Sequence, residues 1–325
     1  MLRLGVVAFL NARPLIAGLE NDPRIGLVFD VPAALPKRLA HREVDAALVP
    51  IIDLMRNADR WQIVSDACIG CDGETMTVRV FSQVPPERIE VLWIDGDSHT
   101  SVALAAILWR QQFGRELTLH PLDAARVPTR DLPAVLLIGD KVIDAARGRF
   151  AYEVDLGSAW RQHTGLPFVF AVWAVRKGVF AVTDDESDPA NEQQNDASPE
   201  QPRSHCQRAV PFAAAGDQCV APQRTASCDP RPTTCSELAA LLNAARDRGL
   251  ASAAHIAEHD GPPRGWPVEL ARRYLTGCLT FRLDERHKAG AELFARYCVA
   301  ADLVPPLGEL PWPPRHGLER RVVRP

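Results

Sequence analysis

Short apolar runs that recur along the first half of the chain, each ending in a polar cluster, restrict its fold more than any other feature. Six have the length and composition of buried strands: LRLGVVAFL, DAALVP, MTVRVFS, IEVLWID, AVLLIGD and FVFAVWAVRK. Helical patterns separate several of these runs, which is typical of an α/β protein with mainly parallel, buried sheets. Because open α/β sheets bind ligands at the carboxyl ends of their strands, the polar clusters are candidate binding residues.

The length and charge of the chain narrow its class. A chain of 325 residues is too long for one ordinary core and suits two lobes with a cleft between them. The 37 basic and 41 acidic residues give no positive field of the kind that nucleic acid binding requires. The apolar run LGVVAFL near the start is too short to span a membrane and lacks a signal-peptide cleavage site. We therefore expect a cytoplasmic protein with reduced thiols, and neither nucleic acid nor membrane as a partner.

The composition changes abruptly after the last strand-like run. Residues 183–235 are rich in Asp, Glu, Gln, Ser and Pro, and we expect this insertion to be mostly disordered because it has little to bury. Its four cysteines match no zinc pattern and are expected to be flexible, unpaired thiols, although a disulfide within the loop is an alternative: Cys206, Cys219, Cys228 and Cys235. Helical spacing resumes beyond it, with Ser236 and Pro267 as N-terminal signals, so the carboxyl part is predicted to be helical.

The stretch IDGDSHTSVALAAILWR, residues 94–110, passes from a strand end through three hydroxyls into an apolar helix. A helix that begins near Ser98 would direct unpaired N–H groups and a positive dipole end into the space above the sheet. A carboxylate fits there, and the hydroxyls of Ser98, Thr100 and Ser101 could bind it. Ordinary helix capping explains one hydroxyl equally well, so both interpretations stand at this point.

Common catalytic motifs are missing from the sequence. It contains no G-x-G-x-x-G, P-loop, H-E-x-x-H or G-x-S-x-G pattern, which argues against nucleotide cofactors and the usual hydrolase elbows. The C-x-x-C pair Cys68 and Cys71 has no second pair to complete a zinc site and runs into a strand, so a metal or redox role is disfavoured. Asp140, at the end of a buried strand, is either a functional carboxylate or a helix cap.

Taken together, the motifs resemble one family. LNARPL, VDAALVP, DGETMTVRVFS, DSHTSVALAAIL, LLIGDKV and DLGSAWRQHTGLPFVFAVWAVR are similar, in order and spacing, to the chorismate dehydratases of the futalosine route to menaquinone. The resemblance covers about residues 2–178, and YLTGCLTFRLDERHKAGAELFARY resembles the end of the same family.

The resemblance implies a two-lobed fold like the type II periplasmic-binding proteins. Lobe one would comprise residues 1–83 and 168–325, and lobe two residues 84–167. It also implies a lyase that removes water from chorismate to give 3-[(1-carboxyvinyl)oxy]benzoate, with chorismate as its small-molecule partner and with no metal or other cofactor.

The resemblance also implies site residues. Asn11 is the candidate catalytic residue, able to orient or polarise the substrate but not to act as a conventional base. The candidate substrate-binding residues are Arg13, Cys71, Asp72, Ser98, Thr100, Ser101, Gly139, Asp140, Thr164, Gly165 and Phe168.

Two features depart from the family pattern. Cys71 stands where many members have serine, and cysteine is the weaker hydrogen-bond donor. The insertion at 183–235 has no counterpart in the family.

No matched residue is an unambiguous base. If Asp72, Glu74 and Asp140 do not reach the ring, the side-chain carboxylate of the substrate could accept the proton. The rival functions are a non-catalytic small-anion binding protein and the enzyme of the same pathway that forms dihydroxynaphthoate.

Overall fold

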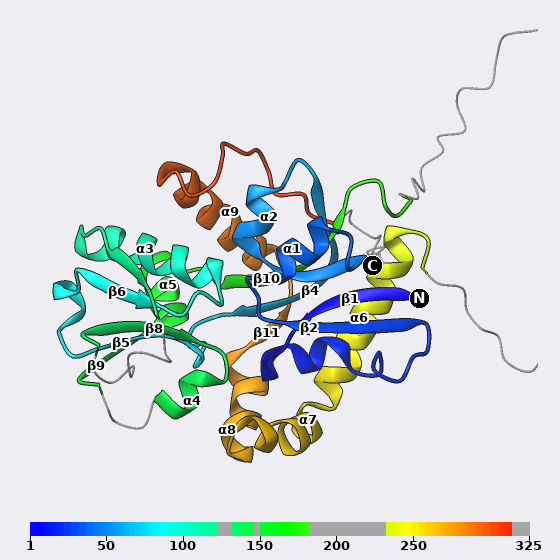
Figure 1. Cartoon of the computed structure of the whole chain (residues 1–325), viewed down its shortest axis with the longest axis horizontal. Helices are drawn as coiled ribbons and strands as arrows, with labels where there is room; N and C mark the ends of the chain where they lie inside the picture. Colours follow the sequence, from blue (N-terminus) through cyan, green and yellow to red (C-terminus); the bar gives the residue numbers. More distant parts are fainter. Residues whose placement is uncertain (123–131, 146–149, 182–231, 314–325) are drawn as a thin grey trace, which may run out of the picture. The chain divides into compact units, whose positions relative to one another are not determined.

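The computed structural model describes residues 1–122, 132–145, 150–181 and 232–313, which form two β-sheets with helices packed against them (Figure 1). The first sheet has the order β11-β4-β10-β3-β1-β2. Its strands are β1 (Leu2–Val7), β2 (Ile25–Asp30), β3 (Ala46–Pro50), β4 (Trp61–Cys71), β10 (Phe168–Arg176) and β11 (Thr280–Arg282). The second sheet has the order β7-β6-β8-β5-β9. Its strands are β5 (Val78–Ser82), β6 (Val91–Ile94), β7 (Thr118–Pro121), β8 (Ala134–Ile138) and β9 (Tyr152–Asp155).

Helices connect the strands and make up most of the described carboxyl part. The helices before β10 are η1 (Leu10–Ile16), α1 (Leu35–Ala40), α2 (Ile51–Arg56), η2 (Pro86–Arg88), α3 (His99–Phe113), α4 (Lys141–Ala145) and α5 (Leu156–Thr164). Those that follow are α6 (Cys235–Ala251), α7 (Ala253–Asp260), η4 (Pro262–Arg264), α8 (Val268–Arg273), η5 (Tyr274–Cys278) and α9 (Glu285–Ala300). Helices α1, α2, α6 and α9 pack on the first sheet, and α4 and α5 pack on the second. None of the helices described here is long and apolar enough to cross a membrane.

The strand directions correct one expectation, because both sheets are mixed rather than mainly parallel. β1 runs parallel to β2 and β3, and β6 runs parallel to β7 and β8. β5 is antiparallel to both of its neighbours, and so is β10. These are the first strands that the chain forms after it passes from one sheet to the other. When the chain enters a sheet at the carboxyl ends of the strands already in it, its first strand there must be antiparallel to its neighbours.

The strand pairing also corrects the position at which the chain is expected to pass from one sheet to the other. The run Val78–Ser82, expected in lobe one, pairs with β8 and β9 in the second sheet. The passage therefore lies in the turn between Cys71 and Val78, and the return lies between α5 and β10. The other lobe limits stay a prediction.

The central strands have continuous apolar sequences because both of their faces are buried. β3 and β8 are buried along their whole length, because helices or loops cover both faces of each sheet. The edge strand β2 is only partly buried.

The carboxyl part begins inside the region that we expected to be disordered. Thr234 is the N-cap of α6: its hydroxyl accepts from Glu237 N, and its own backbone N–H donates to the Glu237 carboxylate. Cys235 is the buried first residue of that helix. Cys235 is thus not a flexible thiol, because tertiary packing orders a helix start that its polar neighbours obscured. Residues 183–231 of the insertion, which include Cys206, Cys219 and Cys228, lie outside the described residues.

Candidate active site

A cavity lies where the carboxyl ends of β1, β3 and β8 meet the amino end of α3, the first part of β10 and the turn that carries the chain from β4 to β5. Both sheets contribute to its lining, and so does η5 from the carboxyl part. The lining residues are Val7, Phe9, Asn11, Pro32, Pro50, Ile69, Thr75, Thr77, Val78, Ser98, Ser101, Ile138, Gly139, Phe170, Ala171, Tyr274 and Leu279.

Two of the three hydroxyls predicted at the start of α3 face this cavity. Ser98 has an extended backbone and is the N-cap of α3, where its Oγ accepts the backbone N–H of Ser101 at 3.2 Å. The two Oγ atoms lie 2.9 Å apart, and both side chains line the cavity. Thr100 points the other way. Its hydroxyl donates to the carbonyl of Phe170 at 3.3 Å and accepts from Ile52 N, so it joins α3 to β10 and α2.

Asn11 projects into the cavity from η1, directly after β1. Its Oδ1 is buried and has no hydrogen-bond partner among the described residues. Such an acceptor costs free energy unless a ligand satisfies it. Arg13, two residues further, turns away from the cavity. Its guanidinium donates to Asp260 at 2.9 Å and to Glu20 at 2.7 Å, so the structure gives it a salt-bridge role.

The end of β8 places Gly139 and Asp140 in different surroundings. Gly139 lines the cavity with a φ of +63°, and a Cβ there would lie 2.7 Å from the ring of Phe9. Asp140 is outside the lining and accepts from Trp266 Nε1 at 2.8 Å and from Leu10 N at 3.3 Å. Burial raises the pKa of Asp140, although these two donors oppose the shift. The carboxylate therefore holds η1 and Trp266 beside the second sheet.

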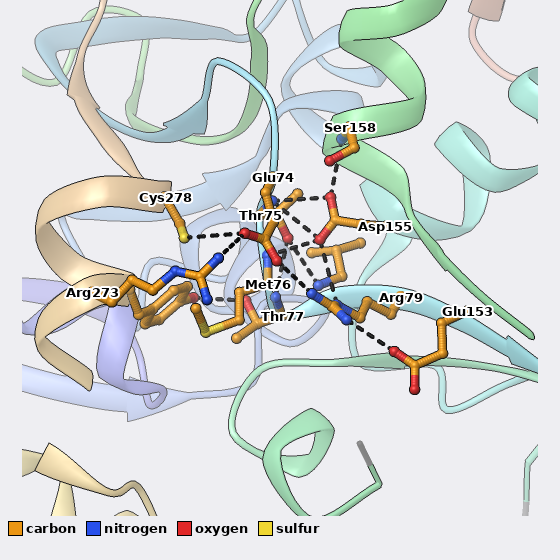
Figure 2. A network of polar contacts seen from close by, with 12 residues as sticks. Glu74, Thr75, Met76, Thr77, Arg79, Glu153, Asp155, Ser158, Arg273 and Cys278 are labelled. Carbon is orange, nitrogen blue, oxygen red and sulfur yellow. Dashed lines mark hydrogen bonds and ion pairs between the residues drawn. The ribbon is translucent and has the colours of Figure 1, made fainter. Parts of the chain in front are cut away.

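The turn that carries the chain from β4 to β5 supplies two more lining residues, Thr75 and Thr77 (Figure 2). Asp155, the N-cap of α5, accepts from Thr75 N at 3.0 Å and Met76 N at 2.8 Å, as well as from Ser158 N at 3.0 Å. Met76 has a φ of +64°, which is unusual for a residue with a side chain. The carboxylate thus fixes a turn in a strained conformation.

Glu74 in the same turn is held by two arginines (Figure 2). Arg79 of β5 donates to its Oε1 at 2.7 Å, and Arg273 at the end of α8 donates to its Oε2 at 2.5 Å. Glu74 is not part of the cavity lining. Its contacts tie the turn to the helix that leads into η5.

Tyr274 is the first residue of η5, a π-helical turn, and reaches the cavity from a distant part of the sequence. Its hydroxyl lies 2.7 Å from Thr77 Oγ1, and its ring stacks on Trp266 with centroids 4.7 Å apart. Burial raises the pKa of the Tyr274 hydroxyl, and the hydrogen bond with Thr77 opposes that shift. The phenol is therefore neutral at ordinary pH.

The two candidates at the end of β4 lie outside the cavity lining. Cys71 is fully buried, and burial raises the pKa of its thiol. Asp72 pairs with Arg161 at 2.9 Å and with Arg286 at 2.8 Å, which joins the turn to α5 and α9. Cys68 and Cys71 are both free thiols, and the described part of the chain holds no group of three His, Cys, Asp or Glu side chains placed to bind a metal.

The candidates at the return passage are structural as well. The Thr164 hydroxyl donates to the carbonyl of Trp160 and accepts from Leu166 N, which closes α5. Gly165 ends that helix in the left-handed conformation, with a φ of +73°. Phe168 is buried against Trp160 and does not reach the cavity.

The cavity lining contains no aspartate, glutamate, histidine, lysine, arginine or cysteine among the residues that the structure describes. Its polar groups are one amide, one phenol and four aliphatic hydroxyls, from Asn11, Tyr274, Thr75, Thr77, Ser98 and Ser101. Of these, sequence reasoning missed Tyr274, Thr75 and Thr77. The two threonines lie in the DGETMTVRVFS motif, and Tyr274 begins the carboxyl segment YLTGCLTFR that resembles the family, but neither motif indicates which of its side chains line a cavity. Such a lining can bind and orient an anion, but it offers no conventional base.

Comparisons with known proteins give a consistent result. A family model described as menaquinone biosynthesis matches residues 2–226. A chorismate dehydratase from Thermus thermophilus is 30% identical over 196 residues, which cover 54% of this chain and 69% of that protein. The alkanesulfonate-binding protein from Xanthomonas axonopodis superposes with a TM-score of 0.58 at 9% identity, covering 95% of this chain and 96% of that one. A Candida albicans protein described as having the generic periplasmic binding protein fold gives a TM-score of 0.57 at 10% identity, with 95% and 92% covered. These structural likenesses confirm the predicted two-lobed fold.

Proposed function

The chain belongs to the menaquinone biosynthesis family, and on that premise we propose that it is a chorismate dehydratase, a lyase that converts chorismate to 3-[(1-carboxyvinyl)oxy]benzoate. Its relative from Thermus thermophilus carries that name. The reaction removes a proton from the ring carbon that bears the ether and expels the neighbouring hydroxyl, which leaves an aromatic ring. Chorismate is then the small-molecule partner, and menaquinone biosynthesis is the process that it feeds.

The observation that carries this proposal is the cavity at the amino end of α3, which Ser98 and Ser101 line together with Asn11 and where the described lining residues carry no charge. Ser98 and Ser101, at the amino end of a 15-residue helix, offer hydroxyls and a positive dipole end to one substrate carboxylate. No lining side chain can take the ring proton as a conventional base, so the side-chain carboxylate of the substrate is the proton acceptor. Asn11 orients the substrate for this transfer, which places catalysis in positioning and neutral hydrogen bonds.

Incubation of the purified protein with chorismate, without added metal or nucleotide, tests the proposal. The enolpyruvyl benzoate should form and be detected by mass and by its ultraviolet absorbance. Chorismate that is bound but recovered unchanged after stoichiometric exposure would instead indicate an anion-binding protein, like the structurally similar sulfonate-binding protein.

Three variants test the assignment of the proton acceptor. Asn11→Ala should nearly abolish turnover, because it removes the cavity amide. Asp140→Asn and Glu74→Gln should keep much of it, because both carboxylates lie outside the lining and hold other parts of the fold. The opposite ranking, measured as kcat with chorismate, would show that one of these carboxylates is the base.

A further inference from the structure

The hydroxyl of Thr75 has no role in the reaction outlined above, although the residue lines the cavity. Thr75 lies in the turn between β4 and β5, where the Asp155 carboxylate accepts from its backbone N–H (Figure 2). Its Oγ1 accepts from Thr77 N at 3.2 Å and from Val78 N at 2.9 Å. The residue is only 1% exposed, so bulk water contributes little to the hydrogen bonding of this hydroxyl.

These two contacts determine which hydrogen bond the Thr75 hydroxyl can still form. A threonine hydroxyl has two acceptor positions and one proton, and backbone N–H groups occupy both acceptor positions of Thr75. The described residues provide no acceptor for its proton. Because a buried donor without an acceptor is unfavourable, the proton is available to a molecule bound in the cavity.

Thr100, a buried threonine outside the cavity lining, has a different hydrogen-bonding pattern. Its hydroxyl accepts from Ile52 N at 3.5 Å and donates to the carbonyl of Phe170 at 3.3 Å. The proton of Thr100 therefore already has an acceptor within the protein, whereas that of Thr75 has none among the described residues. Only Thr75 faces the cavity, which favours a ligand as the missing acceptor.

The same side of the cavity provides one more proton. The hydroxyls of Thr77 and Tyr274 lie 2.7 Å apart and use one of their two protons for the bond between them. The lining thus has two groups of O–H donors on different elements: Ser98 and Ser101 at the amino end of α3, and Thr75 with the Thr77–Tyr274 pair. Two such groups fit a molecule with two separate carboxylates, because charged oxygens form the stronger hydrogen bonds with hydroxyls.

We propose, on the basis of the chorismate dehydratase assignment, that Thr75 is a substrate-binding residue whose hydroxyl donates to the carboxylate that Ser98 and Ser101 do not hold. This contact makes the cavity selective for dicarboxylates over monocarboxylates. Because both acceptor positions of Thr75 are occupied, its hydroxyl binds an acceptor oxygen but not a donor such as an amine. Donors on different elements then hold the two ends of chorismate.

Calorimetric binding of 3-(carboxymethoxy)benzoate and its two monomethyl esters tests the proposal without turnover. The diacid has two carboxylates and an ether but no ring hydroxyl, and each ester has one charged carboxylate. The proteins are the wild type, Thr75→Val, Thr75→Ser and, as a matched control, Thr100→Val. We expect Thr75→Val to weaken diacid binding about 10- to 100-fold, as for one hydrogen bond to a charged group. Thr75→Ser, which keeps the hydroxyl, and Thr100→Val should stay within about 3-fold of the wild type.

The two esters separate a lost hydrogen bond from damage to the turn. Thr75→Val also removes the acceptor of two backbone N–H groups, and a displaced turn would weaken all three ligands alike. If Thr75 binds one carboxylate, the substitution should have a much smaller effect on the ester that blocks that carboxylate than on the diacid or the other ester. Equal weakening of all three ligands, or an unchanged diacid affinity, would overturn the proposal.

These measurements also distinguish the inference from the proposed function. If the wild type leaves chorismate unchanged, the proposed function fails, while the ligand comparison still decides whether Thr75 binds a carboxylate. A wild type that binds the diacid no more tightly than either ester would refute the inference on its own. If Thr75→Val does not fold, Thr75→Cys takes its place, because a thiol still accepts weakly but is a poorer donor. We then expect a loss of diacid affinity of about 3- to 10-fold with the same dependence on the ester, and an unchanged affinity would again count against Thr75.

Discussion

Asp155 is the residue whose removal should damage the fold and the cavity together, and Asp155→Ala is the most direct test of how the turn between the sheets is held. Its carboxylate caps α5 through Ser158 N and also accepts the backbone N–H groups of Thr75 and Met76 (Figure 2). Both of those residues are buried, and Met76 has a left-handed backbone that nothing local favours. Without the carboxylate, two donors lose their partners and the strained turn loses its restraint.

The size of the effect follows from these contacts. Loss of the helix cap costs about 1 kcal/mol, and each of the two buried N–H groups left without an acceptor costs about 1–3 kcal/mol. The sum is about 3–7 kcal/mol. Burial raises the pKa of Asp155, which means that burying its charge already costs free energy in the wild type and offsets part of the stabilisation that its hydrogen bonds provide. We therefore expect the lower end, about 3 kcal/mol.

Urea unfolding of Asp155→Ala beside Thr234→Ala separates the turn from the cap. Thr234 is also an N-cap, of α6, but its side chain accepts from that helix and not from a distant turn. Its removal should cost about 1 kcal/mol and leave turnover of chorismate unchanged. Asp155→Ala should lose about three times as much stability and most of its activity, because Thr75 and Thr77 line the cavity. Equal losses in the two variants would refute the reasoning, since they would leave the helix cap as the whole contribution of Asp155.

Three further results are expected. Gly139→Ala should lower the free energy of unfolding by about 1–3 kcal/mol and raise KM for chorismate, because a left-handed alanine would lie 2.7 Å from the Phe9 ring that lines the cavity; an unchanged KM would contradict this. Ser101→Ala should weaken substrate binding about 10- to 100-fold in calorimetry, as expected for one hydrogen bond to a carboxylate, whereas Thr100→Val should lower stability and leave affinity unchanged. Burial raises the pKa of Asp140 above its ordinary value of 3.8, so the Asp140 carboxyl binds its proton more tightly in the folded protein than in the unfolded chain. The folded protein therefore loses stability as the pH rises from 3.8 through the raised pKa. The difference in stability between Asp140→Asn and the wild type should therefore shift in favour of the variant as the pH rises above 3.8, and a difference in urea midpoint that does not change with pH would contradict the assigned direction.

The residues at strand ends could be placed from sequence because their position depends on local structure. An apolar run followed by a polar cluster fixes where a strand stops, and Asn11, Ser98 and Gly139 each follow such a run and line the cavity. The distinction between Ser101 and Thr100 could not be made in this way. Both belong to the first turn of α3, but one faces the cavity and the other faces β10, and this difference depends on how the helix is rotated against the first sheet.

Tyr274 and Thr77 illustrate why the rest of the site was not predictable. They are 197 residues apart and meet through packing of the carboxyl helices on the passage between the sheets. Within the turn itself, the sequence pointed to Cys71 and Asp72, but the left-handed residue Met76 reverses the backbone and turns Thr75 and Thr77 toward the cavity. A positive φ at a methionine has no signature in composition or periodicity. The same holds for the strand directions, which depend on where the chain re-enters each sheet.

The neutral lining has a consequence for how the proposed reaction proceeds. Arg79 and Arg273 are already paired with Glu74, and Arg13 is paired with Glu20 and Asp260. We therefore expect a substrate dianion to bind to dipoles and hydroxyls, because the described residues that line the cavity include no cation. A cation beside the side-chain carboxylate would lower its pKa and make it a weaker base, whereas apolar neighbours raise the pKa of a carboxylate. Val7, Ile69 and Phe170 provide such apolar surface in the lining. If the substrate supplies its own base, a cavity lined by uncharged side chains attracts the substrate less strongly. In return, the carboxylate that must accept the ring proton keeps a higher proton affinity.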